Sequence, residues 1–216
     1  MRAGWPKAMQ PAAKPQLDLA NGYYALPPGK MANVVTCLEM RARPERTLAP
    51  LPAPYCLKQF GPDDTANFRQ LVRQVGEPWL WLSRMIMPED ELRARLSDPA
   101  VFMARLCDEQ SLGLVELDFR ETSTCEIVQF GLLPGQTGKG LGGKLMDAAL
   151  ALAWSRPVTR VWLHTCNNDS PQAVPFYLRC GFHAYARMVE IHDDPRLHGK
   201  LPLSAAPHIP IIGYHP

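Results

Sequence analysis

The stretch LLPGQTGKGLGGKLM, residues 132–146, carries five glycines between an apolar run and a segment in which apolar residues recur at helical spacing. Glycines in such a loop let backbone N–H groups approach phosphate oxygens at the positive end of the helix that follows. The stretch therefore predicts a strand–loop–helix unit that binds a phosphate-bearing ligand.

The spacing from Gly138 also fits two other phosphate-binding motifs. As G-x-x-x-x-G-K it is nearly a P-loop, but the next position is Leu145, where magnesium coordination needs a hydroxyl. As G-x-G-x-x-G it is a dinucleotide fingerprint, which requires an acidic residue at the end of the next strand, about 20 residues on. That strand ends around His164 instead, and several elements precede the loop. Both interpretations are therefore disfavoured.

Periodicity elsewhere predicts alternating strands and helices. Asp63 is the expected N-cap of the first helix, and Ser170 with Pro171 is the expected start of the last one. Strands are expected at residues 55–60, 101–107, 112–120, 125–133, 158–165 and 182–191, and helices at residues 63–76, from Pro88, at 141–154 and at 170–180. This order predicts an α/β domain whose sheet is antiparallel early and later includes a crossover helix.

Proline marks both ends of the chain. Many of the 22 prolines lie before residue 55, which predicts an N-terminal extension over residues 1–54. Within it, MANVVTCLEM (residues 31–40) is apolar enough to add one strand. We expect a catalytic domain over residues 55–192 and a proline-rich tail over residues 193–216.

Composition excludes several classes of function. Lys and Arg number 23 against 21 acids, so a net charge of +2 gives no field that favours nucleic acid or a membrane surface. The six cysteines are scattered without metal-site spacing, which indicates reduced thiols and no metal. The chain has no apolar run of about 20 residues and no signal-peptide core near Met1, so we expect a cytoplasmic protein.

Over about residues 55–190 the chain resembles the GNAT N-acetyltransferase superfamily. The family's loop, Gln/Arg-x-x-Gly-x-Gly/Ala, follows a strand that ends apolar-x-Pro, and here residues 132–134 (Leu-Leu-Pro) precede residues 137–142, with Thr137 at the Gln/Arg position. The second motif, Asn-x-x-Ala-x-x-x-Tyr, falls on Ser170, Ala173 and Tyr177, with serine in place of asparagine. Residues 164–173 are similar to a bacterial subgroup that carries His-Thr-Cys-x-x-Asp-x-Pro-x-Ala.

The resemblance implies a mixed, mostly antiparallel central sheet flanked by helices, with one strand splayed from its neighbour and acetyl-coenzyme A as cofactor. The splayed strand would bind the pantetheine arm through backbone groups, and Gly131 fits a bulge or a close approach there. The implied cofactor-binding residues are Phe130, Leu132, Leu133, Gln136, Thr137, Gly138, Lys139, Gly140, Leu141, Gly142, Ser170, Ala173 and Tyr177.

Catalytic candidates follow from the chemistry of amine acylation. Tyr177 is the candidate general acid, because a phenol can give its proton to a departing thiolate. The amine must be neutral to attack, and either Glu126 or Glu116 could be the base, of which we favour Glu126. His164 and Cys166 are interpreted as structural.

The sequence thus predicts an enzyme that moves an acetyl group from coenzyme A to a primary amine by direct attack. The expected acceptor is a small molecule or a peptide. Trp79 and Trp81 lie where the family places its acceptor site, and packing in the core is the alternative explanation for them. Homodimer formation is left open. The alternative is a non-catalytic module on the same fold that binds or senses acyl-coenzyme A.

Overall fold

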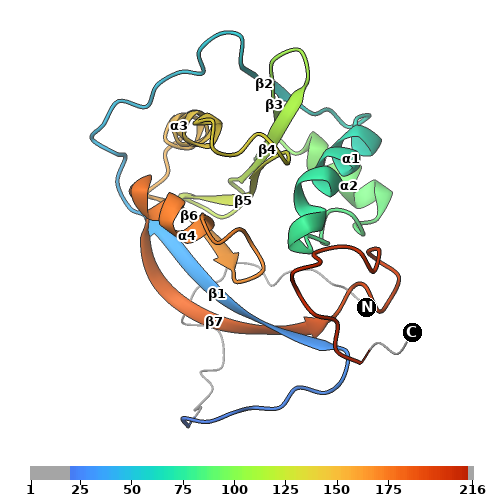
Figure 1. Ribbon diagram of the computed structural model, residues 1–216. Coiled ribbons are helices and arrows are strands. Elements are labelled where there is room, and N and C mark those ends of the chain that lie inside the picture. Colours follow the sequence, from blue (N-terminus) through green and yellow to red (C-terminus); the bar gives the residue numbers. More distant parts are fainter. Residues whose placement is uncertain (1–19, 214–216) are drawn as a thin grey trace.

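One seven-stranded sheet organises the protein, in the order β2-β3-β4-β5-β6-β1-β7 (Figure 1). The structure, a computed structural model, describes residues 20–213, so the ends of the expected extension and tail lie outside the described residues. The strands are β1 (Lys30–Met40), β2 (Cys56–Gln59), β3 (Val101–Cys107), β4 (Ser111–Asp118), β5 (Thr124–Leu132), β6 (Arg160–Cys166) and β7 (His183–Asp193). Among the strands of residues 20–213, β5 and β6 alone pair in parallel, so the predicted mixed, mostly antiparallel sheet is confirmed.

Helices cover both faces of this sheet (Figure 1). On one face, α3 (Leu141–Ala153) and α4 (Ala173–Arg179) pack in the larger core, where Leu145 and Phe182 are fully buried. On the other face, α1 (Thr65–Gly76) and α2 (Glu89–Ser97) form a second core around Phe68. A short 3-10 turn, η2 (Glu77–Trp79), follows α1.

Strand β1 lies inside the sheet rather than at its margin. The strand expected at residues 31–40 is present, and it pairs antiparallel with β6 on one side and with β7 on the other. Its alternation explains the position: Val35 and Cys37 are buried on one face, and Leu38 and Met40 join the larger core. A strand that is apolar on both faces gains most stability where both faces are covered.

Two helices begin later than their expected caps. The residue before α1 is Asp64, not Asp63, and its Oδ2 accepts a hydrogen bond from Gly61 N at 2.8 Å rather than from the helix. Helix α4 begins at Ala173, because residues 170–172 form a turn. Pro175 consequently falls in the first helical turn, where backbone N–H groups have no partner within the helix, so its missing N–H costs no helical hydrogen bond.

The chain after β7 folds back on the domain as far as residue 213. Arg196 is buried, pairs with Asp194 and donates to the carbonyl oxygens of Ala205, Ala206 and Ile209. Ala205 and Ala206 also pack against Leu80. The division into extension, domain and tail stays a prediction. Among the described residues, no helix has the length and apolar character to cross a membrane.

Candidate active site

The parallel pair β5 and β6 separates after only three residue pairs. Residues 124–126 pair with residues 160–162, and beyond Glu126 the two strands diverge, with β5 following β4 and β6 following β1. The splayed strand is therefore present. Backbone groups of β5 beyond the divergence are available to a ligand, because their ladder partners are on one side only.

A bulge accompanies the divergence, but not at the expected residue. Glu116 pairs with Gln129 and Leu117 pairs with Ile127, which leaves Val128 as the extra residue of β5. Gly131 instead marks a close approach, since a Cβ there would stand 2.4 Å from Val75 Cγ1 and 3.2 Å from Trp81 Cη2.

We expect Gly131→Ala to destabilise the fold by about 1–3 kcal/mol, the usual cost of overpacking. Urea denaturation measures it. Gly143→Ala is the control, because a Cβ there meets nothing within 4 Å and alanine favours a helix. Equal stability of the two variants would contradict the close approach at Gly131.

The glycine loop leads into a helix whose N-terminus is open. Gly138 and Gly140 have φ of +79° and +76°, a region that glycine adopts at little cost. Within the described part of the chain no side chain caps α3, and Lys144 N makes the first helical hydrogen bond, to Gly140 O. The N–H groups of the first turn thus face a site suited to an anion. At Gly142 a Cβ would stand an ordinary 3.6 Å from Phe176, so packing does not require glycine there.

The expected cofactor-binding side chains are divided between the core, the glycine loop and the starts of α3 and α4. Phe130, Leu132 and Ala173 pack together in the larger core, where Phe130 stacks on Phe176 with ring centroids 5.7 Å apart. Thr137 and Lys139 are exposed in the loop. The remaining candidates are Leu133 and Gln136, partly buried at the start of the loop, Leu141, buried at the first position of α3, and Ser170, whose Oγ accepts from Gln172 N before α4.

Tyr177 on α4 is almost entirely buried. Its ring makes edge contacts with Phe130, Phe176 and Phe182. Burial, followed by the negative charge of Asp169, raises the pKa of Tyr177 well above the usual value for a phenol. The phenol therefore holds its proton across the working pH range and is a donor, though a weaker acid than a phenol in water.

Glu126 lies where β5 and β6 begin to diverge, on the sheet face that carries α1 and α2. Burial, followed by the charges of Asp118 and Glu116, raises the pKa of Glu126 to about 7. His164, two residues beyond the last pair on β6, places Nδ1 3.8 Å from Glu126 Oε1. A carboxyl with a pKa near neutrality is suited to general-base catalysis.

Glu116 lies in a different electrostatic environment from Glu126. It is fully buried and accepts hydrogen bonds from Arg84 and Arg95 at 2.7–2.9 Å. Burial alone would raise the pKa of Glu116, but the attraction of the two guanidinium groups outweighs it and lowers the pKa. Glu116 is thus held as a carboxylate, which makes it a poor proton acceptor. It anchors the segment between α1 and α2.

Asp169 was not among the expected site residues. It accepts a hydrogen bond from Trp81 Nε1 at 2.9 Å and bonds from Thr165 Oγ1 and Cys166 N at the end of β6. Trp81, whose ring lies against Gly131, therefore joins the α1–α2 segment to the β6–α4 loop across the diverging strands. The signal in the sequence is an aspartate directly before Ser-Pro, typical of a turn.

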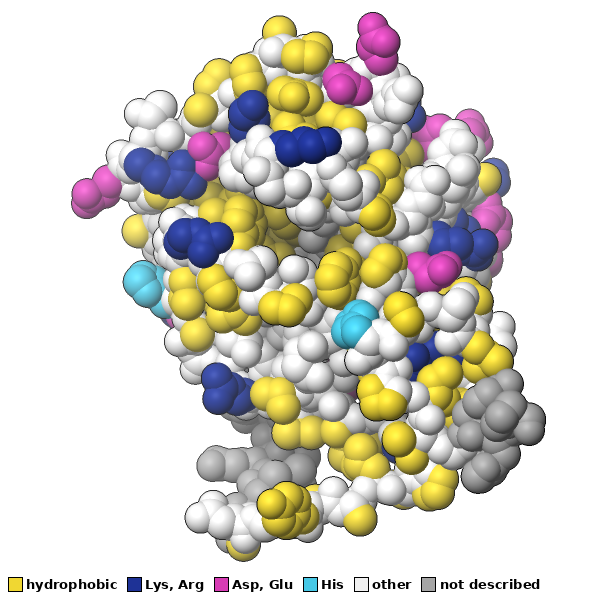
Figure 2. Space-filling view, in the orientation of Figure 1, with side chains coloured by type: hydrophobic (Ala, Val, Ile, Leu, Met, Phe, Trp, Pro, Cys, Tyr) yellow, Lys and Arg dark blue, Asp and Glu magenta, His cyan; other side chains and the backbone are white. Residues whose placement is uncertain are grey.

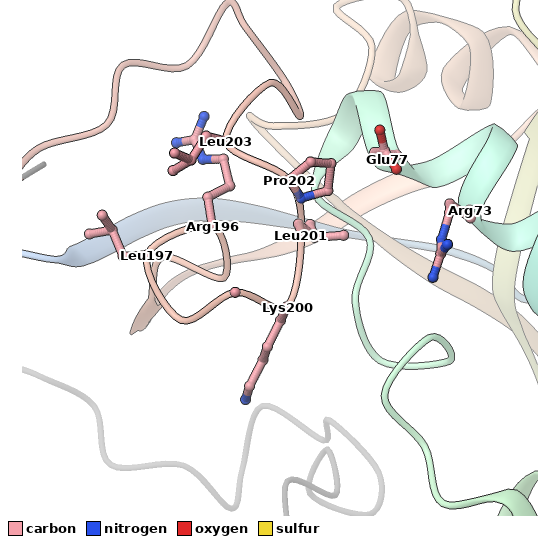
Figure 3. A pocket seen from close by; sticks show the side chains of 9 residues that line it. Arg73, Glu77, Arg196, Leu197, Lys200, Leu201, Pro202 and Leu203 are labelled. Carbon is pink, nitrogen blue, oxygen red and sulfur yellow. The ribbon is translucent and has the colours of Figure 1, made fainter. Parts of the chain in front are cut away.

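The surface of the protein contains hollows. Figure 2 shows a hollow near the centre of one face of the molecule, with apolar side chains around it. A cavity of about 640 Å³ lies between α1 and the tail, lined by Arg73, Glu77, Arg196, Leu197 and residues 199–203 (Figure 3). It contains none of the expected site residues. Among residues 20–213, no group of three or more His, Cys, Asp or Glu side chains could hold a metal.

Solved structures share this fold at low sequence identity. A GCN5-related N-acetyltransferase from Sphaerobacter thermophilus superposes with a TM-score of 0.57 at 16% identity, covering 76% of this chain and 53% of that one. An aminoglycoside acetyltransferase from an uncultured soil metagenomic sample gives 0.52 at 16%, covering 65% and 95%. A functionally unknown conserved protein from Staphylococcus epidermidis gives 0.54 at 15%, covering 76% and 62%. The chain thus spans 53% of the length of the Sphaerobacter protein and 62% of the length of the Staphylococcus protein. No curated protein matches the sequence.

A mixed sheet with two diverging strands, followed by a glycine loop at an open helix N-terminus, defines a fold that acetyltransferases use. The family model for the acetyltransferase (GNAT) family matches residues 68–182. The chain belongs to the GNAT family. Members of this family generally use acetyl-coenzyme A.

Proposed function

We propose that this protein transfers an acetyl group from acetyl-coenzyme A to a primary amine by direct attack on the thioester. The divergence of β5 from β6 next to the uncapped N-terminus of α3 carries the proposal. A long ligand with amide and phosphate groups needs hydrogen-bonding partners. The unpaired edge of β5 suits the amide groups, and the open N–H groups at the start of α3 suit the phosphates.

The residues present suit coenzyme A. The first turn of α3 and the open backbone at Gly138 and Gly140 would hold the pyrophosphate, with the Lys139 ammonium beside them. The edge of β5 from Phe130 to Leu133 would hold the pantetheine arm. When bound, acetyl-coenzyme A supplies an activated thioester.

Two side chains would then each carry out one proton transfer. Glu126 takes a proton from the amine, and its carboxylate form predominates above a pH of about 7. We therefore expect kcat/KM to rise as the pH increases through 7. Tyr177 gives a proton to the departing sulfur, and a backbone N–H near Phe130 stabilises the oxyanion.

A second candidate function is binding or sensing of acyl-coenzyme A without turnover. The observation that favours it is the burial of Tyr177 among three phenyl rings, which is also how a core tyrosine lies. Release of free thiol from acetyl-coenzyme A in the presence of a panel of primary amines separates the two candidates, because a sensing module releases none.

Gly140→Val tests the cofactor site. Valine is strained at φ +76°, so the loop must change shape, and we expect calorimetry to detect no coenzyme A binding. Gly199→Val is the matched control, because Gly199 also has a positive φ of +64° and open space around its Cβ, but lies in the tail. Unchanged coenzyme A affinity in Gly140→Val, or preference of the parent for a nicotinamide dinucleotide, would overturn the assignment.

A further inference from the structure

The sheet face opposite α3 and α4 brings a carboxyl and an imidazole together where β5 and β6 begin to diverge. Glu126 is the last residue of β5 that pairs with β6, and its partner is Trp162. His164 follows two residues later on β6, so alternation places it on the same face as Trp162. The result is the separation of 3.8 Å between Glu126 Oε1 and His164 Nδ1.

From this arrangement we propose that His164 is a positioning residue for Glu126. The His164 imidazole holds the Glu126 carboxyl toward the amine and carries the proton from that carboxyl to solvent. The proposal rests on the proposed function. It changes the interpretation of His164, which the sequence alone indicated to be structural.

Accessibility supports this direction of proton movement. The His164 Nδ1 atom is buried, whereas 22% of the His164 side chain remains exposed. The Glu126 side chain is itself 25% exposed. The Glu126 carboxyl therefore lies next to an imidazole whose side chain is partly exposed. The 3.8 Å separation is about 1 Å longer than a hydrogen bond, and a side-chain rotation or one bridging water closes it.

The proton balance is complete without another reactant. An alkylammonium gives one proton to Glu126 and attacks as the neutral amine. Glu126 passes that proton to His164 Nδ1, and the imidazolium loses a proton to water from Nε2. The second proton of the nitrogen leaves as the amide forms and balances the one that Tyr177 gives to the sulfur. The sum is amide, free thiol and one proton in solution.

The other charged groups around Glu126 are not suited to accept its proton in place of His164. Asp118 and Glu116 face it from β4, and Arg84 and Arg95 face it from the α1–α2 segment and from α2. Asp118 and Glu116 accept the hydrogen bonds of these arginines, which are themselves poor proton acceptors. Among these neighbours, His164 carries the one imidazole, a group whose ordinary pKa lies near neutral pH.

The first test needs no amine. Imidazole titration by NMR on the full chain follows His164, assigned by the loss of its signal in His164→Gln. Replacing the negative charge with Glu126→Gln should lower the pKa of His164 by about one unit, because an opposite charge lies within about 4 Å. His183, exposed on β7, serves as the control and should not move. A shift of His164 no larger than that of His183 would overturn the pairing.

The second test uses activity with acetyl-coenzyme A and an amine identified by thiol release. We expect His164→Gln to lower kcat/KM about 10- to 100-fold and to displace the rising limb of the pH profile, while His183→Gln changes neither. A parallel loss at every pH would mean a merely structural role. If the parent binds no coenzyme A while the coupled titration persists, the proposed function and the relay fail together, and only a structural ion pair remains.

Discussion

Tyr177→Phe should reduce turnover about 10²- to 10⁴-fold while coenzyme A affinity stays nearly constant. The substitution keeps the ring and its edge contacts with Phe130, Phe176 and Phe182, and it removes only the proton donor. The measurement is the steady-state rate with a saturating amine, together with calorimetry for coenzyme A.

Tyr185→Phe provides the control, because Tyr185 is a half-buried tyrosine on β7, away from the glycine loop. It should leave the rate unchanged. A Tyr177→Phe rate within about threefold of the parent, well below the general-acid range, would remove Tyr177 from the mechanism. Its raised pKa makes this outcome informative, since a weaker acid leaves more room for a water to protonate the sulfur.

Glu116→Gln should destabilise the fold by about 3–5 kcal/mol, the effect of removing one partner from a buried ion pair. The glutamine keeps the volume but leaves the guanidinium groups of Arg84 and Arg95 without their shared carboxylate. Urea denaturation measures the difference. Glu91→Gln on the exposed face of α2 is the matched control and should stay within about 0.5 kcal/mol of the parent.

The pH dependence of this difference has a definite sign. The folded pKa of Glu116 lies below its ordinary value of 4.5, so its contribution is present above pH 4.5 and is lost as the pH falls through the folded pKa. We therefore expect the gap between parent and variant to narrow in acid. A gap that stays constant from pH 7 to pH 3 would show that packing, not charge, makes Glu116 important.

Local patterns in the sequence were sufficient for much of this fold. The glycine loop, the strand before it and the helix after it were all predicted, since glycine spacing and apolar periodicity act over a few residues. Helix starts were less certain. Asp63 and Ser170 both have capping side chains, but a turn just before α1 and another before α4 move the first helical residue beyond them.

The sequence by itself determined the family, the position of the glycine loop and the set of acids from which a candidate base could be chosen. Only the tertiary structure decided that β1 lies between β6 and β7. It also decided that the pKa of Glu116 is lowered whereas the pKa of Glu126 is raised. The two glutamates look alike along the chain, but Arg84 and Arg95, 32 and 21 residues from Glu116, meet it in the core. A carboxyl's protonation depends on the charges and solvent around it, and those neighbours are brought together by the fold.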